Sequence, residues 1–472
     1  MLFNSLDFLC FFLIVCFTYW LLPSKFRWIL LLICSYFFYA YWNPYYLILL
    51  FTSTLIDYLF GLYFTSSNNP IKKKIGLTIS LLLNFGLLFS FKYYNFFTDG
   101  LNELTYLIFD RKFIPNYSIL LPVGISFYTF QSTSYAIDVY RKNIPAERNL
   151  GKFALFISFF PQLVAGPIER AKNLLPQINN QKKYISFQDV TEGVKLIIWG
   201  LFIKLVVADN LATLIDRKFE DLVNQTGGAL AFVMILFTFQ LYCDFSGYSK
   251  IAVGVSRLLG FRLMNNFNYP LISSSFGEFW KRWHISLSEW FRDYVYIPLG
   301  GSKKNIQITL LNILVVFILS GLWHGATLNF VLWGVLCGVF FIVEYVLIKY
   351  IFSQIKCWNY FKAIQIVLIF SLFTFSLVPF RASDLADTWL IYKKIFQSSF
   401  GDLYFWFVDN RYSPGIVGLY LFVFIEIWFG LKLNKLFNIK NPITESIFYV
   451  LIFFMIILLG KDTGSQFIYF QF

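Results

Sequence analysis

The sequence predicts an all-α fold, a polytopic transmembrane helical bundle that also contains re-entrant and interfacial helices. Of the 472 residues, 58% are hydrophobic and only 14% are charged, whereas about a quarter of the residues in a soluble domain are charged. The apolar residues form long runs without the alternation of barrel strands, and a helix satisfies its own backbone hydrogen bonds in lipid. The basic residues lie mostly in short groups between these runs. Lipid must therefore surround much of the chain.

Twelve apolar runs are candidate spans, although several are shorter than the roughly 20 residues that cross a bilayer as a helix. We therefore expect about ten to twelve spans, and we expect residues 1–472 to form a single integral-membrane domain. The runs are Leu6–Leu22, Trp28–Trp42, Tyr45–Phe64, Ile75–Phe91, Ile119–Tyr140, Val194–Asp209, Ala229–Phe245, Ile306–Trp323, Phe330–Ile348, Ala363–Phe380, Ile416–Gly430 and Ile447–Gly460.

The charges of the connecting segments predict how the chain is oriented in the membrane. Lys25 and Arg27 follow the first run and Lys72–Lys74 follow the third, whereas the segment Asp99–Asp110 is acidic. Cytoplasmic loops carry the excess of Lys and Arg. The N-terminus is therefore expected outside and Lys72–Lys74 in the cytoplasm of a bacterium, with the chain in its inner membrane. Because acidic Asp7 replaces a basic leader region, the first run is expected to be a retained span.

Charge and cysteine usage exclude several other classes of protein. The net charge of +13 is explained by the cytoplasmic loops and does not indicate a nucleic-acid partner. The six cysteines include no C-x-x-C pair, which argues against a disulfide framework or a zinc ribbon. No metal site is expected, because the two histidines are not spaced as ligands on one helix.

Two regions depart from the simple pattern of spans. Phe153–Ile168 is apolar but contains Pro161, Gly166 and Pro167, which predicts a re-entrant or broken segment sheltered by protein. Ile251–Lys304 is amphipathic and too charged to span, so we expect short interfacial helices there. A long interfacial stretch before the last apolar runs suggests an active site.

The chain has only two histidines, His284 and His324, and each follows a tryptophan, Trp283 or Trp323. A histidine in or beside a span is costly to place and indicates a functional site. Histidine is also the side chain best suited to take a proton from a hydroxyl near neutral pH. The alternative is a histidine that packs or caps a helix, and the residues alone leave both interpretations open.

His324 is the stronger candidate because small residues surround it. Gly321, Gly325 and Ala326 lie within three positions of His324, and we expect them to let a substrate approach the ring closely.

Other polar residues could line the same site. Leu241–Lys250 holds Asp244 and Ser246 and is expected to end the seventh span; the alternative is a turn at a helix end. Asp57 and Glu426 lie in or near spans and each needs an internal partner, although neither can be given a role.

These motifs together resemble the membrane-bound O-acyltransferase family, and within it the bacterial branch of alginate and peptidoglycan O-acetyltransferases. The resemblance covers nearly the whole chain and is most specific in the region 121–334, where two W-H motifs occur in order. It is carried by LPVGISFYTFQSTSYAIDVYR (121–141), FFPQLVAGPIERA (159–171), LYCDFSGYSKIAVGVSRLLGF (241–261), NFNYPLISSSFGEFWKRWHISLSEWFRDYVYIPLGG (266–301) and GLWHGATLNFVLWG (321–334), with VPFRASD (378–384) and the terminal FIYFQF in support.

The resemblance implies a fold and an activity. The implied fold is a ring of spans thinned at its centre, where an outer funnel and a cytoplasmic tunnel meet at the histidine. The implied catalytic base is His324, the upstream polar position is His284, and the family's aspartate and serine motif maps onto Asp244 and Ser246. We expect Trp283, Trp323 and Gln131 to bind substrate or line the tunnel.

The resemblance also implies the substrates. The donor is cytoplasmic acetyl-CoA, with no bound cofactor. The acceptor is a hydroxyl of an extracytoplasmic polysaccharide, reached directly or through a periplasmic acetyltransferase partner, and membrane lipid surrounds the chain.

Two alternatives compete with this interpretation. Within the family, the chain could transfer D-alanine to a teichoic acid. From another class, it could be a transporter or flippase of glycan or lipid, which would predict internal repeats and paired broken helices. Only one broken segment is visible in the sequence.

Overall fold

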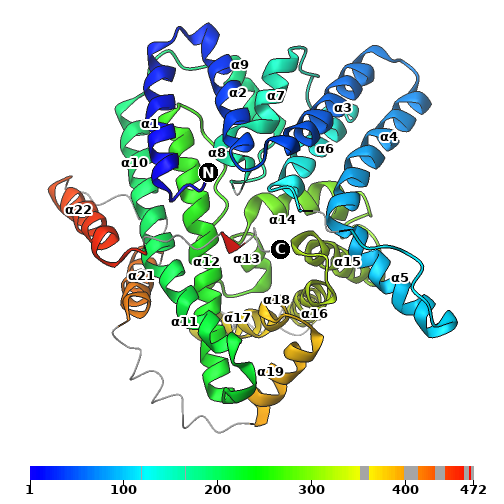
Figure 1. Ribbon diagram of the computed structural model, residues 1–472, viewed down its shortest axis with the longest axis vertical. Coiled ribbons are helices and arrows are strands. Elements are labelled where there is room, and N and C mark those ends of the chain that lie inside the picture. Colours follow the sequence, from blue (N-terminus) through cyan, green and yellow to red (C-terminus); the bar gives the residue numbers. More distant parts are fainter. Residues whose placement is uncertain are drawn as a thin grey trace. The chain divides into compact units, whose positions relative to one another are not determined.

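The regular elements that the structure describes are helices, most of which are labelled in Figure 1. The structure is a computed structural model that describes residues 1–117, 120–164, 166–350, 361–397, 413–430, 442–461 and 467–468. The predicted all-α fold class is confirmed over these residues. The chain divides into two compact units, which are described separately: unit 1 is Met1–Val190 with Val255–Met264, and unit 2 is Thr191–Gly254 with Asn265–Phe472.

Unit 1 contains nine helices, several of which begin where the sequence supplies a capping residue. At the start of the fourth helix the Asn69 side chain accepts hydrogen bonds from the backbone N–H groups of Ile71 and Lys72, and Pro70 occupies the first helical position. The helices are α1 (Leu6–Leu21), α2 (Ser24–Ala40), α3 (Leu47–Ser66), α4 (Pro70–Leu88), α5 (Tyr94–Phe109), α6 (Ile125–Tyr140), α7 (Leu150–Ser158), α8 (Phe160–Leu163) and α9 (Ala171–Asn179).

A buried polar network joins α3 and α4. The Asp57 carboxylate accepts hydrogen bonds from Ser80 Oγ at 2.6 Å and from Asn84 Nδ2 at 3.0 Å. Ser53 Oγ donates to Asn84 Oδ1 at 2.6 Å and lies 3.4 Å from Ser132 Oγ of α6. Asp57 is fully buried, and these neighbours are the internal partners that the sequence required for it.

The predicted break in Phe153–Ile168 is confirmed. Helix α7 ends at Ser158, Phe159 takes a non-helical conformation (φ −50°, ψ 106°), and α8 begins at Phe160. The Phe160 N–H, which the break would leave unsatisfied, donates to Ser35 Oγ at 3.1 Å. The side chains around the break are buried in protein, as an interrupted backbone at membrane depth requires.

Unit 2 is built on helices that approach one another closely. A Cβ atom at Gly200 would lie 2.7 Å from the carbonyl oxygen of Gly247, and one at Gly247 would lie 2.9 Å from that of Gly200. The two helices therefore touch backbone to backbone. The elements are α10 (Phe187–Leu201, which starts in unit 1), a π-helical turn η3 (Phe202–Ala208), α11 (Asp209–Glu220), α12 (Gly227–Leu258, which ends in unit 1), α13 (Phe276–Trp280), α14 (Ile285–Phe291), α15 (Ile306–His324), α16 (Leu328–Tyr350), α17 (Lys362–Ser376), α18 (Val378–Arg381), α19 (Leu385–Gln397), α21 (Pro414–Gly430) and α22 (Pro442–Leu459).

Helix α12 corrects one expectation. The segment Leu241–Lys250 lies inside a helix and not at the end of one, because α12 runs without a break over 32 residues from Gly227 to Leu258. Its Ser and Gly residues are helical rather than part of a turn, and Gly247 serves the close approach to α10. The short helices expected in Ile251–Lys304 are present, but they begin only after α12 ends.

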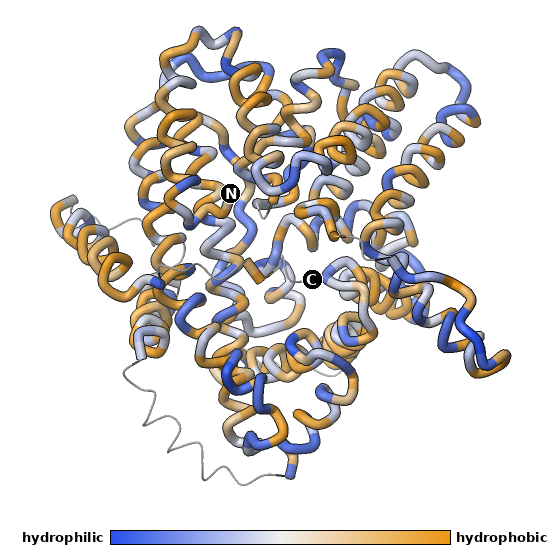
Figure 2. The backbone as a smooth tube through the Cα atoms, in the orientation of Figure 1, coloured by the Kyte–Doolittle hydropathy of each residue, from blue (hydrophilic) through white to orange (hydrophobic). Residues whose placement is uncertain are grey.

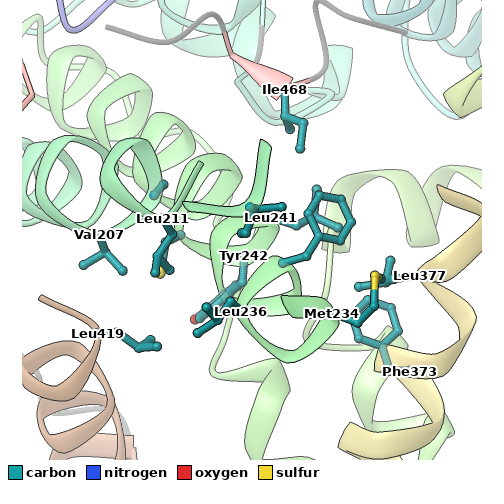
Figure 3. Close-up of a cluster of buried hydrophobic side chains, with 14 of the residues drawn as sticks. Val207, Leu211, Met234, Leu236, Leu241, Tyr242, Phe373, Leu377, Leu419 and Ile468 are labelled. Atoms are coloured by element: carbon teal, nitrogen blue, oxygen red, sulfur yellow. The ribbon is translucent and has the colours of Figure 1, made fainter. Parts of the chain in front are cut away.

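The apolar core of unit 2 is assembled from residues far apart in the sequence. Figure 3 shows side chains of η3, α11, α12, α17 and α21 in one buried cluster, including Val207, Leu241, Phe373 and Leu419. Ile468, near the end of the chain, belongs to the same cluster.

Six helical stretches of the described chain are long and apolar enough to cross a membrane, and three shorter apolar helices accompany them. The protein is therefore a multi-pass membrane protein. Figure 2 shows that hydrophobic residues dominate these helices and that hydrophilic residues gather mainly at their ends and in the connections. The total of ten to twelve spans, the single domain and the orientation stay predictions. The long stretches are Pro44–Ser66, Pro70–Phe109, Gly227–Leu258, Ile306–His324, Leu328–Tyr350 and Lys362–Arg381.

Candidate active site

His324 is the last residue of α15, and aromatic rings surround it. Its ring centroid lies 4.9 Å from that of Trp333, 5.0 Å from that of Trp323 and 5.5 Å from that of Phe380. Only 4% of the residue is exposed. The helix ends here because the chain turns at Gly325 to begin α16.

The small residues beside His324 serve packing rather than access, which corrects the expectation from the sequence. A Cβ atom at Gly321 would lie 2.2 Å from the carbonyl oxygen of Phe330, and one at Gly325 would lie 2.1 Å from the ring of Phe330. The space that the two glycines leave is therefore filled by α16. A substrate has to reach His324 from another direction.

His284 lies between the short helices α13 and α14, in a left-handed backbone conformation with φ +42°. Its ring packs edge-on against Phe245, with centroids 4.6 Å apart, and the residue is 1% exposed. Burial lowers the pKa of His284 to about 3, because the apolar surroundings disfavour the charged imidazolium. The ring is therefore neutral at physiological pH.

One cavity of about 120 Å³ is lined by both histidines. Trp323 stands between them, with its ring centroid 5.7 Å from that of His284. The two histidines therefore share one cavity in unit 2. The remaining wall is mostly apolar, with two hydroxyl groups, and consists of Trp280, Trp283, Leu287, Ser288, Phe291, Val316, Phe317 and Ser320.

Asp244 belongs to a buried ion cluster instead of the wall of this cavity. Its carboxylate lies 2.5 Å from Lys204 Nζ, which also lies 2.8 Å from Asp209 Oδ1. The other oxygen of Asp244 accepts a hydrogen bond from the backbone N–H of Ile468 at 2.8 Å. The cluster ties α12 to η3, to the start of α11 and to the last described residues of the chain. Both carboxylates pair with the one ammonium group of Lys204, which gives each buried charge an opposite partner.

Ser246 and Gln131 do not line the cavity either. Ser246 is fully buried in α12, and its hydroxyl has no hydrogen-bond partner within the described residues. Gln131 lies in α6 of unit 1, where its Nε2 donates to the Phe156 carbonyl at 2.6 Å. That contact supports the backbone of α7 near its break. The roles predicted for Ser246 and Gln131 stay predictions.

Two further residues contact the predicted site residues, and neither was itself predicted from the sequence. Asn266 Oδ1 lies 3.1 Å from Nδ1 of His284, and Lys204 holds Asp244. Lys204 could have been found as a cation in the middle of the apolar run Val194–Asp209. No pattern in the sequence points to Asn266, because it lies 18 positions before His284 in the chain.

Comparison with known proteins shows that this chain is similar to acyltransferases. The family model of the membrane-bound O-acyltransferases matches residues 144–381. The chain is 38% identical over 451 residues to the probable alginate O-acetylase AlgI of Pseudomonas aeruginosa, over 94% of this chain and 84% of that protein. It is 40% identical over 385 residues to the probable alginate O-acetylase AlgI of Azotobacter vinelandii, over 81% and 75%. It is also 34% identical over 334 residues to a peptidoglycan O-acetyltransferase of Helicobacter pylori, over 66% and 62%.

Proposed function

Because the chain belongs to the membrane-bound O-acyltransferase family, we propose that it moves an acetyl group from cytoplasmic acetyl-CoA to an extracytoplasmic hydroxyl. The protein is an O-acyltransferase, and the transporter alternative is set aside by this membership. Relatives named as alginate O-acetylases and a peptidoglycan O-acetyltransferase support acetyl as the acyl group and a polysaccharide as the acceptor. The acetyl group reaches the polysaccharide directly or through a periplasmic acetyltransferase partner, and the bacterial inner membrane separates donor from acceptor.

The observation that carries this proposal is the cavity that His284 and His324 line together. A thioester is already activated toward attack, so the enzyme has to supply a deprotonated acceptor. Two imidazoles at one cavity can bind and deprotonate a hydroxyl. The apolar wall formed by residues such as Leu287 and Val316 excludes water, which would otherwise hydrolyse the thioester.

In the proposed reaction the acceptor oxygen attacks the carbonyl carbon of the acetyl thioester while His324 takes the hydroxyl proton. The carbon–sulfur bond then breaks, and the coenzyme A thiolate leaves and recovers the proton from His324. The products are the acetyl ester of the acceptor and free coenzyme A.

The two histidines have different parts in this scheme. With a pKa of about 3, His284 is too weak a base to hold the transferred proton near neutral pH. It accepts a hydrogen bond from a second hydroxyl of the polysaccharide acceptor and so orients the reacting hydroxyl, whose only proton goes to His324.

The test places the purified protein in sealed vesicles with acetyl-CoA on one side and an acceptor oligosaccharide on the other. We expect acetyl ester to form on the oligosaccharide only when the donor faces the side of Lys72–Lys74. A parallel vesicle set with D-alanyl carrier protein as donor tests the D-alanyl alternative. Hydrolysis of acetyl-CoA without ester formation, with or without a periplasmic partner, would contradict the proposal.

A further inference from the structure

Asn266 is buried beside His284 and joins the loop after α12 to the turn before α14. Its Oδ1 lies 3.1 Å from His284 Nδ1, and it accepts hydrogen bonds from Ser286 N at 3.2 Å and Ser286 Oγ at 2.9 Å. Its backbone carbonyl accepts a hydrogen bond from Ile285 N at 2.9 Å. Asn266 is 2% exposed, so water does not compete for these contacts.

The backbone N–H of Ser286 determines which way the Asn266 amide faces. A backbone N–H can only donate, so the amide atom that it meets must be the oxygen. If the amide were reversed, its NH₂ group would face another donor inside the protein, which is costly.

The orientation of Asn266 in turn determines the tautomer of His284. The ring nitrogen Nδ1 faces the same oxygen, and an oxygen that only accepts requires a donor, so Nδ1 carries the hydrogen. The ring is neutral and has a single N–H. The lone pair of His284 therefore lies on Nε2, at the opposite edge of the ring.

We propose that Asn266 is a positioning residue for acyl transfer, which holds His284 in the tautomer whose Nε2 accepts a hydrogen bond from a second hydroxyl of the polysaccharide acceptor, beside the hydroxyl that reacts. This inference rests on the proposed function, because it presumes that the hydroxyl binds in the cavity that His284 lines. In the other tautomer Nε2 would be a donor, and it could not accept the hydrogen bond of that second hydroxyl.

Asn266 also maintains the backbone that presents the ring. A non-glycine residue with positive φ is strained by about 1–3 kcal/mol and persists only where its surroundings hold it. His284 has this conformation, and Asn266 bonds the two residues that follow it, Ile285 and Ser286. The side chain of Asn266 sets the tautomer, and its side chain and backbone carbonyl together hold the conformation.

A double-mutant cycle in kcat tests the proposal, using Asn266→Ala, His284→Ala and the double variant in lipid nanodiscs. We expect Asn266→Ala to lower kcat about tenfold to hundredfold, with the KM for the acyl donor within about twofold of wild type. Because Asn266 acts through His284, the double variant should be no slower than His284→Ala. Losses that multiply in the double variant would overturn the proposal.

Asn312→Ala is the matched control. Asn312 is also a buried amide of unit 2, and it donates to the carbonyls of Leu299 and Gly301 at 3.3 Å without lining the cavity. Its loss should lower the Tm and leave kcat unchanged. If Asn312→Ala lowered kcat as strongly as Asn266→Ala, the effect of Asn266 would be structural and the proposal would fail.

A second variant, Asn266→Asp, keeps the accepting oxygen and provides a signature that a merely structural role would not give. A carboxylate beside Nδ1–H stabilises the imidazolium, which has no lone pair on Nε2. We expect kcat near wild type in alkaline buffer and a new decline as the pH falls. A pH profile parallel to wild type, or a uniform loss at all pH values, would overturn the proposal. Absence of acetyl transfer by the wild-type protein would instead defeat the proposed function.

Discussion

The Asp57 network of unit 1 and the histidine cavity of unit 2 both place polar groups among apolar side chains, but they differ in what the polar groups face. The Asp57 carboxylate faces donors from its own protein, Ser80 and Asn84. His284 and His324 line a cavity of about 120 Å³.

A polar residue buried among apolar side chains is therefore not sufficient evidence of a catalytic site. An isolated acid in a span is expensive and suggests function, yet Asp57 joins helices. The discriminating feature is a cavity that the polar atoms share. Replacing residues of the histidine cavity should change catalysis without changing stability, whereas replacing residues of the Asp57 network should do the reverse.

The largest effect is expected for His324→Ala. Removal of a general base costs about 10²–10⁴-fold in rate, while the His324 ring already borders a cavity, so that its loss enlarges an existing space. We expect the turnover number to fall by at least 10²-fold, with a Tm within a few degrees of wild type, measured in the same detergent preparation. Retention of activity within about tenfold, less than 1.4 kcal/mol of barrier, would remove His324 as the base.

A smaller loss is expected for His284, and its size should depend on the replacement. His284→Ala removes both the orienting acceptor and the contact with Asn266, and should cost about tenfold to hundredfold in kcat. His284→Asn should be milder, because an amide retains a donor and an acceptor. Equal losses for the two variants would show that the hydrogen bonds of His284 do not contribute.

Asp57→Ala should act on stability. It leaves the donors of Ser80 and Asn84 buried without their acceptor, at about 1–3 kcal/mol of unfolding free energy. We expect a lower Tm and unchanged activity per folded molecule. Asp57→Asn retains one accepting oxygen and serves as the graded control. If Asp57→Ala abolished activity in protein that remained folded, the contrast between the two regions would be wrong.

The smallest effect is a pH dependence of stability that originates at His284. Its pKa is lowered from the ordinary value of 6.5 to about 3 in the folded protein, so below pH 6.5 the unfolded chain binds a proton that the folded chain excludes. Stability from this group is complete above pH 6.5 and falls as the pH decreases toward 3, by at most about 1.4 kcal/mol per pH unit. The difference in Tm between wild type and His284→Asn should therefore change between pH 7.5 and 5. A constant difference would contradict a neutral, buried His284.

The predictions that hold depend on the composition of the chain or on how rare a residue type is in it. A charge content of 14% required a membrane protein, and two histidines in the whole chain could be examined individually. The break at Phe159 followed from the proline and glycine residues nearby. These inferences need only local chemistry, and the structure bears them out.

The predictions that are wrong concern residues whose role depends on the side chains that pack against them. Gly321 and Gly325 were expected to admit substrate, but Phe330 occupies their space. Asp244 was placed at a helix end, whereas it lies within α12 and pairs with Lys204. Asn266 gave no sign of its contact with His284. Such long-range contacts are set by tertiary packing, which no pattern along one segment encodes.

The most direct test of the central claim is to block the cavity without altering either histidine. Ser320 lines the cavity, and the next residue along α15, Leu319, is exposed, so the two can be compared as Ser320→Cys and Leu319→Cys. After treatment with a bulky thiol-specific reagent, the account predicts that Ser320→Cys loses acetyl transfer and that bound acyl donor slows the loss, while Leu319→Cys and wild type stay active. Full activity of completely labelled Ser320→Cys would contradict the assignment of this cavity as the site of acyl transfer.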